Sequence, residues 1–178
     1  MDQHDIILVN EQDEQTGTGE KMDVHFKALL HRAFSVFIFN EKGEMLLQRR
    51  ALSKYHSGGL WTNACCSHPR PGETTIAGAQ RRLKEELGFS VPLTKIFDFI
   101  YKAPFNNGLT ENEFDHVFIG KYNRTITANP EEVMDYCYKP MEEIKSELFL
   151  SPEKFTAWFH IAFPRIETFF SHTDYSDF

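Results

Sequence analysis

One short helix set among strand-like segments is the feature that most limits how this chain can fold. Residues 75–87 are predicted to form a helix with a stripe of core-facing residues along one side. Gly88 follows them and favours a helix C-terminus. The stripe consists of Ile76, Gln80, Leu83 and Leu87. Strand-like runs flank the helix at residues 32–39, 45–49, 95–101, 113–122 and 134–139. Strands interleaved with few helices predict an α/β or α+β fold, with a mixed sheet sandwiched by helices.

Turn and cap residues refine this expectation. The turn Asn40-Glu41-Lys42-Gly43 predicts that the two strands before the helix form a hairpin. Ser151 as N-cap and Pro152 as the first helical residue predict a second helix, which Pro164 should kink or end. Another short helix is expected from Pro140.

The length predicts one domain. A chain of 178 residues is close to the ordinary size of a single domain, and it has no internal repeat and no linker long enough to divide it. We therefore expect one domain over 1–178, with its core at about 20–160. The tail at 171–178 is expected to fray or to form a lid.

Charge and cysteine usage exclude several classes of protein. The 19 Lys and Arg residues are outnumbered by 26 Asp and Glu, giving a net charge of −7, which argues against a nucleic-acid partner. No apolar run approaches the roughly 20 residues that span a bilayer. Cys65, Cys66 and Cys137 form no disulfide framework. We expect a cytoplasmic globular protein with no membrane partner, and monomer and homodimer both stay open.

The middle of this acidic chain is basic. Only one acid, Glu73, stands among its bases before Glu85. The bases are Arg49, Arg50, Lys54, Arg70, Arg81, Arg82 and Lys84. Such a local excess predicts a site for a small anion. A chance fluctuation on a solvated surface is the alternative.

The helix carries a recognisable arrangement of charges. Glu73, followed after seven residues by Arg81-Arg82-Leu83-Lys84-Glu85-Glu86-Leu87-Gly88-Phe89, resembles the Nudix box, whose carboxylates hold a divalent cation on a diphosphate. Ser67 stands where the box has Gly, and Arg82 stands where it has Glu. The substitution favours holding a diphosphate over hydrolysing one. The plainer interpretation is a pair of surface ion pairs spaced i,i+4.

The segment before the helix contains adjacent cysteines with different prospects. If residues 61–69 are extended, Cys66 and His68 point to one face and Cys65 to the other. A buried cysteine is usually inert packing, and we keep that interpretation for Cys65. The neighbouring box and His68 make Cys66 a candidate for chemistry.

A metal site is a further candidate. Glu111 and Glu113 share one face of a strand, and with three histidines they supply five ligands, which suits an octahedral ion better than tetrahedral zinc. The histidines are His25, His31 and His68. The pattern alone does not select them from eight histidines. The structural or exposed ones are expected to be His4, His116, His160 and His172.

Taken in order, these residues resemble the metal-dependent, Nudix-fold type of isopentenyl-diphosphate isomerase over roughly residues 20–160. The matching segments are Glu20-Lys21, His25, His31-Arg32-Ala33-Phe34-Ser35, Arg49-Arg50-Ala51-Leu52-Ser53-Lys54, Trp61-Thr62-Asn63, Cys66-Ser67-His68-Pro69, Glu111-Asn112-Glu113 and Glu132-Val133-Met134-Asp135-Tyr136. Arg82 is expected in this family.

The resemblance implies a chemistry for each group. Isopentenyl diphosphate would become dimethylallyl diphosphate through a tertiary carbocation. Cys66 and Glu113 would be the two proton-transfer groups, on opposite faces of the substrate, and which of them protonates first stays open. Tyr101 would orient Glu113 or assist proton transfer, and Trp158 would face the cation. For both aromatic residues, ordinary core packing is the alternative.

The resemblance also implies two metals and an anion clamp. One Mn²⁺, Zn²⁺ or Mg²⁺ would bind at the His/Glu site. The diphosphate would be held by Lys21, Arg50, Lys54 and Arg82. A Mg²⁺ ion would bridge it to Glu86 and the backbone carbonyl of Cys66. Arg49 should point away. The competing hypotheses are a Nudix pyrophosphohydrolase of a nucleoside diphosphate derivative and a non-catalytic metal-dependent binding module.

Overall fold

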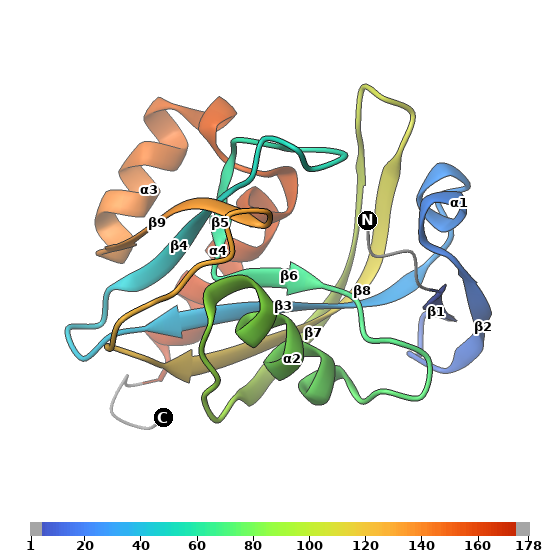
Figure 1. The fold of residues 1–178 in the computed structure, drawn as a ribbon, viewed down its shortest axis with the longest axis horizontal. Coiled ribbons are helices and arrows are strands. Elements are labelled where there is room, and N and C mark those ends of the chain that lie inside the picture. The colour runs from blue at the N-terminus through green and yellow to red at the C-terminus, as the bar shows by residue number, and fades with distance from the viewer. Residues whose placement is uncertain (1–4, 174–178) are drawn as a thin grey trace.

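A computed structural model describes residues 5–173 and shows an α+β fold in which one mixed sheet lies between helices (Figure 1). The strands are β1 (Asp5–Val9), β2 (Gln15–Glu20), β3 (His31–Phe39), β4 (Met45–Arg50), β5 (Trp61–Asn63), β6 (Cys65–Ser67), β7 (Thr94–Pro104), β8 (Thr110–Lys121) and β9 (Val133–Lys139). The helices are α1 (Lys21–Phe26), α2 (Thr75–Leu87), α3 (Met141–Leu150) and α4 (Ala157–Ser171), with a 3-10 turn η1 (Pro152–Lys154). The predicted fold class is confirmed.

Three neighbouring strands bring site residues into one row. β3 pairs in parallel with β8, and His31 lies opposite Glu113. β8 pairs antiparallel with β7, and Glu113 lies opposite Tyr101. The register therefore places His31, Glu113 and Tyr101 side by side across the sheet.

The predicted hairpin of β3 and β4 is correct only at its turn. The amide of Gly43 donates to the carbonyl of Asn40 at 3.0 Å, and Phe39 pairs with Met45. Beyond that pair the strands separate, because β6 supplies the partner for β3 and β5 supplies the partner for β4. The segment 61–67 thus fills a fork between two strands, which fixes its side chains from both sides.

Alternation of side chains builds one core on each face of the sheet. From β3, Phe34 and Val36 pack in a cluster with Leu83 of α2. Phe37 of the same strand packs in a second cluster with Phe159 of α4. The sheet therefore lies between α2 and α4, in agreement with Figure 1.

Helix α2 begins and ends as expected, but its buried face differs from the predicted stripe. Gly88 caps it with a φ of 77°. Leu83 and Leu87 are buried, whereas Ile76 is exposed and Gly78 and Ala79 lie inside. A Cβ atom on Gly78 would stand 3.1 Å from the Phe34 ring, so small residues let the helix approach the sheet here. A stripe drawn from large apolar residues overlooks such a contact.

The last helix departs from its predicted start. Ser151 and Pro152 begin η1, and α4 starts later, at Ala157 after its N-cap Thr156. Pro164 does not end it, because the missing amide lies on an exposed turn and the helix continues to Ser171. The expected helix after Pro140 is confirmed as α3. Of the predicted tail 171–178, residues 174–178 lie outside the described residues.

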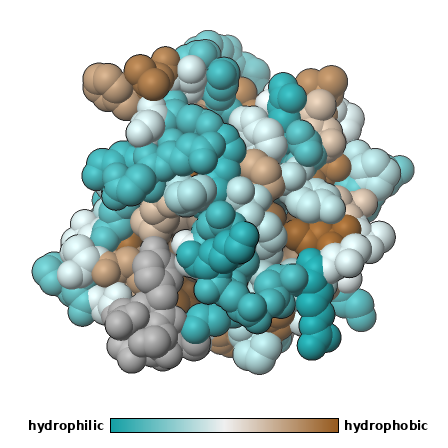
Figure 2. Space-filling view, turned by 90° about the vertical axis from the view of Figure 1, so that its left-hand side faces the viewer, coloured by the Kyte–Doolittle hydropathy of each residue, from teal (hydrophilic) through white to brown (hydrophobic). Residues whose placement is uncertain are grey.

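The surface is mostly polar. The face seen in Figure 2 is covered largely by hydrophilic side chains, with apolar ones in separate groups. Among the helices of residues 5–173, none has both the length and the apolar character required to cross a bilayer.

Candidate active site

A small, solvent-connected cavity opens beside the fork and gathers most of the predicted site residues. It lies among α1, the loop 51–60, β6, α2, the β7–β8 hairpin and α4. The predicted residues that line it are Lys21, Arg50, Lys54, Cys66, His68, Arg82, Glu86, Tyr101, Glu111, Glu113 and Trp158. His25 and His31 do not line it, because both are fully buried in contact with Glu111.

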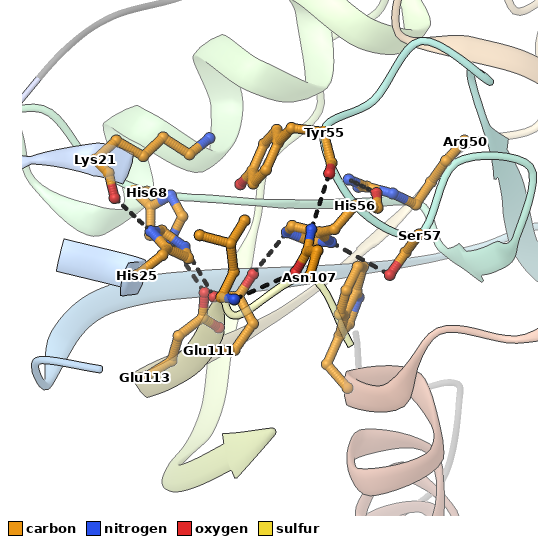
Figure 3. A network of polar contacts seen from close by, with 12 residues as sticks. Lys21, His25, Arg50, Tyr55, His56, Ser57, His68, Asn107, Glu111 and Glu113 are labelled. Atoms are coloured by element: carbon orange, nitrogen blue, oxygen red, sulfur yellow. Dashed lines mark hydrogen bonds and ion pairs between the residues drawn. The ribbon is translucent and has the colours of Figure 1, made fainter. Parts of the chain in front are cut away.

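The five predicted metal ligands converge. One ligand atom from each lies within 4.8 Å of all the others, and all five residues are buried. Figure 3 shows four of them, His25, His68, Glu111 and Glu113. His25 belongs to α1 and His31 to β3. Glu111 and Glu113 belong to β8, and His68 directly follows β6. The set consists of His25, His31, His68, Glu111 and Glu113.

Backbone carbonyls fix the tautomers of two of these histidines. His25 Nδ1 lies 2.6 Å from the carbonyl oxygen of Lys21, and His31 Nδ1 lies 2.8 Å from that of Leu29. Each Nδ1 therefore carries a hydrogen and donates it, and in the neutral ring this leaves a lone pair on Nε2. The Nε2 atoms are the ones that point into the cluster.

Those lone pairs lie close to another ring nitrogen and to a carboxylate oxygen. His31 Nε2 lies 3.2 Å from His68 Nε2, and His25 Nε2 lies 3.0 Å from Glu111 Oε2. His25 Nε2 and Glu111 Oε2 are buried without a hydrogen bond. Burial lowers the pKa of His68 to about 3, so this ring is neutral at neutral pH and does not satisfy the cluster by taking up a proton. A divalent cation would satisfy the whole set, and the residues present fit one.

The two carboxylates have different second partners. Glu113 Oε1 lies 3.0 Å from His68 Nε2, and its Oε2 accepts a 2.6 Å hydrogen bond from the Tyr101 hydroxyl. Although burial and Glu111 oppose it, contacts with His31 and His68 hold the pKa of Glu113 below its ordinary value. Glu113 can therefore accept a proton.

His56 is a site residue that the sequence analysis missed. Its Nε2 lies 3.0 Å from Glu111 Oε1 (Figure 3). Its ring stacks on Phe105, with the ring centroids 4.5 Å apart, and meets Trp158 edge-on. It comes from the irregular loop 51–60, where no periodicity marks a buried position. Asp115 was also missed, although it stands two residues after Glu113 and so shares its face of β8.

The basic residues form one wall of the cavity. Lys21 Nζ lies 4.9 Å from the Tyr55 ring centroid, and Arg50 donates to the carbonyl of His56 at 3.3 Å. Lys54 pairs with Glu132. Burial and the surrounding cations lower the pKa of Lys21, although Glu111 opposes them. An anion bound beside Lys21 would therefore stabilise its charged form.

Arg82 is held by several carboxylates and is not a surface pair. It contacts Glu85 at 2.8 Å, Glu86 at 2.7 Å and Glu132 at 3.2 Å, with 11% of its side chain exposed. Burial lowers the pKa of Arg82, but Glu86 and the other acids raise it by more, so the net shift is upward and the guanidinium is charged. Gln48 Nε2 donates to the second oxygen of Glu86 at 2.9 Å.

The remaining basic residues lie apart from the cavity wall. Arg49 donates to the carbonyl of Gly59, as alternation along β4 predicted. Arg81 forms a two-pronged pair with Glu73 at 2.8 and 2.9 Å and also contacts Glu85.

The adjacent cysteines have opposite surroundings, as predicted. Cys65 is fully buried in the core beneath α2. Cys66 faces the cavity, where its Sγ donates to Asn63 Oδ1 at 3.0 Å and lies 3.4 Å from Ser35 Oγ. Burial and Asp115 raise the pKa of the Cys66 thiol, so the sulfur keeps its proton at neutral pH.

Trp158 and Tyr101 pack together at the apolar end of the cavity. Each is less than a tenth exposed, and both belong to one small cluster with Ala103. The Trp158 indole N–H donates to Thr62 Oγ1 at 2.9 Å, and Arg50 lies 5.1 Å from its ring centroid. Both aromatic residues therefore line the cavity as well as pack.

The other histidines are placed away from the cluster. His116 is buried beside Asp13 at 3.0 Å, and His160 Nε2 lies 2.8 Å from the carbonyl of Pro152. His172 is the C-cap of α4. His4 lies outside the described residues.

Sequence comparison identifies relatives along nearly the whole chain. A family model described as the NUDIX domain matches residues 29–159. The isopentenyl-diphosphate Delta-isomerase of Pectobacterium atrosepticum is 48% identical over 162 residues, covering 91% of this chain and 90% of that protein. The Serratia proteamaculans protein of the same name is 49% identical over 154 residues, covering 86% of each.

Solved structures share the fold at lower identity. DR0079 from Deinococcus radiodurans matches with a TM-score of 0.70 and 22% identity, over 83% of this chain and 90% of that one. The MutT protein from Methanosarcina mazei Go1 gives 0.64 and 23%, over 78% and 94%. The chain therefore belongs to the NUDIX family and, within it, to the isopentenyl-diphosphate Delta-isomerases.

Proposed function

We propose that the protein converts isopentenyl diphosphate to dimethylallyl diphosphate in isoprenoid biosynthesis, by adding a proton at one end of the allylic system and removing one at the other. The observation that carries the proposal is the sharing of one cavity by Cys66 and Glu113. One of these groups holds a proton and the other can take one, which is what a proton-transfer isomerisation needs.

Tyr101 supports the proton transfer at the Glu113 end. Its hydroxyl donates to Glu113 Oε2 and so fixes the orientation of the carboxylate. Burial and the charges of Glu113 and Glu111 raise the pKa of Tyr101, so it stays a donor. Tyr101 can therefore orient Glu113 and share its proton.

The aromatic end of the cavity protects the intermediate. A tertiary carbocation is trapped by water, so the hydrocarbon tail must be kept dry. Trp158 presents a buried indole to that end, and such a face stabilises a desolvated cation by up to about 2 kcal/mol.

The histidine and carboxylate cluster is proposed to hold one Mn²⁺, Zn²⁺ or Mg²⁺ ion. A bound ion would neutralise both carboxylates and hold Glu113 in place. The residues that would hold it are His25, His31, His68, Glu111 and Glu113.

The opposite wall is proposed to bind the diphosphate. Lys21, Arg50, Lys54 and Arg82 line it, and binding there would orient a five-carbon tail that has no polar group of its own. A Mg²⁺ ion accompanying the diphosphate would be held by Glu86 and the backbone carbonyl of Cys66.

Arg82 argues against pyrophosphate hydrolysis. It contacts both Glu85 and Glu86, the carboxylates that would otherwise be free to gather metal around an attacking water. Its charge instead faces the cavity that would receive the diphosphate.

The free thiols of Cys65, Cys66 and Cys137 support a reducing, cytoplasmic setting.

The test supplies the metal-replenished protein with isopentenyl diphosphate and, separately, with a panel of nucleoside diphosphate derivatives. Proton NMR should show dimethylallyl diphosphate accumulating. A phosphate assay coupled to a phosphomonoesterase, which detects the monophosphates that pyrophosphate cleavage releases, should show none from the panel. Nucleotide hydrolysis without isomerisation would establish the pyrophosphohydrolase in its place.

A further inference from the structure

Two buried polar side chains that the proposed reaction does not use lie between Cys66 and Trp158. Thr62 is 1% exposed and Asn63 is fully buried, and both belong to β5, the strand that fills the fork beside β4. Buried polar groups are costly unless they are hydrogen-bonded, so their partners show what they are for.

Every hydrogen-bonding position of the Thr62 hydroxyl is used. It accepts from the Trp158 indole at 2.9 Å and from the Thr156 hydroxyl at 3.2 Å. It donates to Asn63 Oδ1 at 2.9 Å. A hydroxyl has one hydrogen and two lone pairs, so with both acceptor positions filled its hydrogen must go to Asn63.

The Asn63 amide is saturated in the same way. Its Nδ2 donates to the carbonyls of Val36 and Cys65, at 3.0 Å each, which settles which amide atom is the oxygen. Its Oδ1 accepts from Thr62 and from the Cys66 thiol. The amide is thereby clamped to β3 and β6, and the chain of bonds has one direction only.

We infer that Thr62 and Asn63 are positioning residues, which hold the Cys66 thiol and the Trp158 indole in a fixed relation through the chain Trp158–Thr62–Asn63–Cys66. The inference rests on the roles proposed above for Cys66 and Trp158. Packing alone leaves a cysteine side chain its choice of rotamers, whereas a directional bond to a clamped amide selects one. The proton-transfer group and the cation-facing ring are then set by a single rigid unit.

The test compares Thr62→Val, which keeps the shape and removes the hydroxyl, with Thr62→Ser, which keeps the hydroxyl. Thr62→Val should move the indole N–H resonance of Trp158 upfield, shift the Cβ resonance of Cys66 and lower kcat about 10- to 100-fold with KM within about threefold. Thr62→Ser should restore all three. The NMR spectra are recorded on Zn²⁺-loaded protein. The chain has two tryptophans, and the spectrum of Trp61→Phe identifies which indole resonance belongs to Trp61 and which to Trp158.

Thr156→Val is the matched control, because it removes only a donor to Thr62 and leaves the chain to Cys66 intact. It should keep kcat near the wild-type value. The inference fails if Thr62→Val turns over normally, if Thr62→Ser is equally impaired, or if the Cys66 resonance ignores Thr62.

A measurement on the wild type covers the case in which Thr62→Val does not fold. The hydrogen-bonded indole N–H of Trp158 should exchange with solvent far more slowly than that of half-buried Trp61, and equal rates would overturn the inference. If the wild type does not isomerise the substrate, the proposed function fails, while the NMR results still decide whether the unit exists.

Discussion

Cys66 and Cys65 are neighbours in β6 with the same chemistry and opposite exposure to the cavity. The strand alternates its side chains, so one thiol packs under α2 and the other meets Asn63 and Ser35. Their difference therefore isolates the effect of position from the effect of residue type.

Replacing each cysteine by serine should separate the two roles. Cys66→Ser should reduce kcat by about a thousandfold or more, because a hydroxyl is a much weaker acid than a thiol. Cys65→Ser should leave kcat within about threefold while lowering stability, since it buries a hydroxyl in an apolar cluster. Steady-state turnover and thermal melting measure both; an active Cys66→Ser enzyme would remove the thiol from the mechanism.

His56 should matter for metal affinity through its contact with Glu111. His56→Phe keeps a ring to stack on Phe105 but loses the Nε2 contact. Loss of such an outer contact typically costs 10- to 100-fold in metal affinity, and we expect about that for Mn²⁺ titrated by electron paramagnetic resonance. His160→Phe, away from the cluster, is the control. Equal affinities in both variants would contradict this role.

Residue patterns anticipate some members of the site and not others. Alternation correctly separates Cys65 from Cys66, and the five residues that the resemblance suggested as metal ligands lie together in the structure. His56 could not be found this way, because the loop that carries it has no period and its burial depends on Phe105 from the distant β7–β8 hairpin. Partners contributed by tertiary contact leave no local signal.

At the scale of elements, α2 is joined to its own approach by an ion pair. Glu73 lies two residues before the helix starts, and Arg81 reaches back to it with both guanidinium prongs. The backbone amide of Arg70 donates to the same carboxylate at 2.9 Å. This pair anchors the loop that leads from the site into the helix.

The stability from this anchor should depend on pH. Arg81 lowers the pKa of Glu73 below 4.5, its value outside the fold. A depressed carboxylate pKa stabilises the fold above the unfolded value, and the contribution disappears as pH falls through the folded value. Glu73→Gln should therefore cost about 1 kcal/mol at neutral pH and progressively less below pH 4.5 in denaturant titrations. Glu41→Gln, exposed in a turn, is the control; a pH-independent difference would contradict the assignment.

The C-terminal helix offers a stabilising change. Pro164 lies inside α4 on an exposed turn, and it can donate no amide hydrogen to the carbonyl of His160. Pro164→Ala should restore that bond and raise the free energy of unfolding by about 1 kcal/mol or more. Chemical denaturation measures the change. An unchanged or lower value would show that the helix is shaped around the proline.

Helices and strands differ in how far local signals predict them. The predicted bounds of α2, Thr75 and Leu87, are confirmed, and its caps Thr74 and Gly88 lie directly beside them, because caps act within a turn. The fork between β3 and β4 does not follow from local signals, because the partners of each strand come from residues 61–67, more than ten residues away. The N-terminal hairpin β1–β2 was also not predicted, since β2 is a polar, glycine-containing segment with no apolar alternation.

For the whole molecule, the separation of charge matters more than its sum. The net charge of −7 is an average over the chain, and it is compatible with a cavity wall that carries Lys21, Arg50, Lys54 and Arg82. Glu111 and Glu113 belong to the cluster proposed to hold a metal, and Glu132 pairs with Lys54 and Arg82, two residues of the proposed clamp. An acidic protein can thus carry a local group of cations beside Trp158, where the diphosphate is proposed to bind.

The most direct test of the central claim, proton addition and removal by Cys66 and Glu113, is turnover in D₂O. Isopentenyl diphosphate, Mg²⁺ and the metal-replenished enzyme are incubated, and the product is examined by deuterium NMR. The account predicts deuterium in the newly formed methyl group of dimethylallyl diphosphate, and no product from Cys66→Ala. A product that forms without solvent deuterium, or that Cys66→Ala still forms at the wild-type rate, would contradict it.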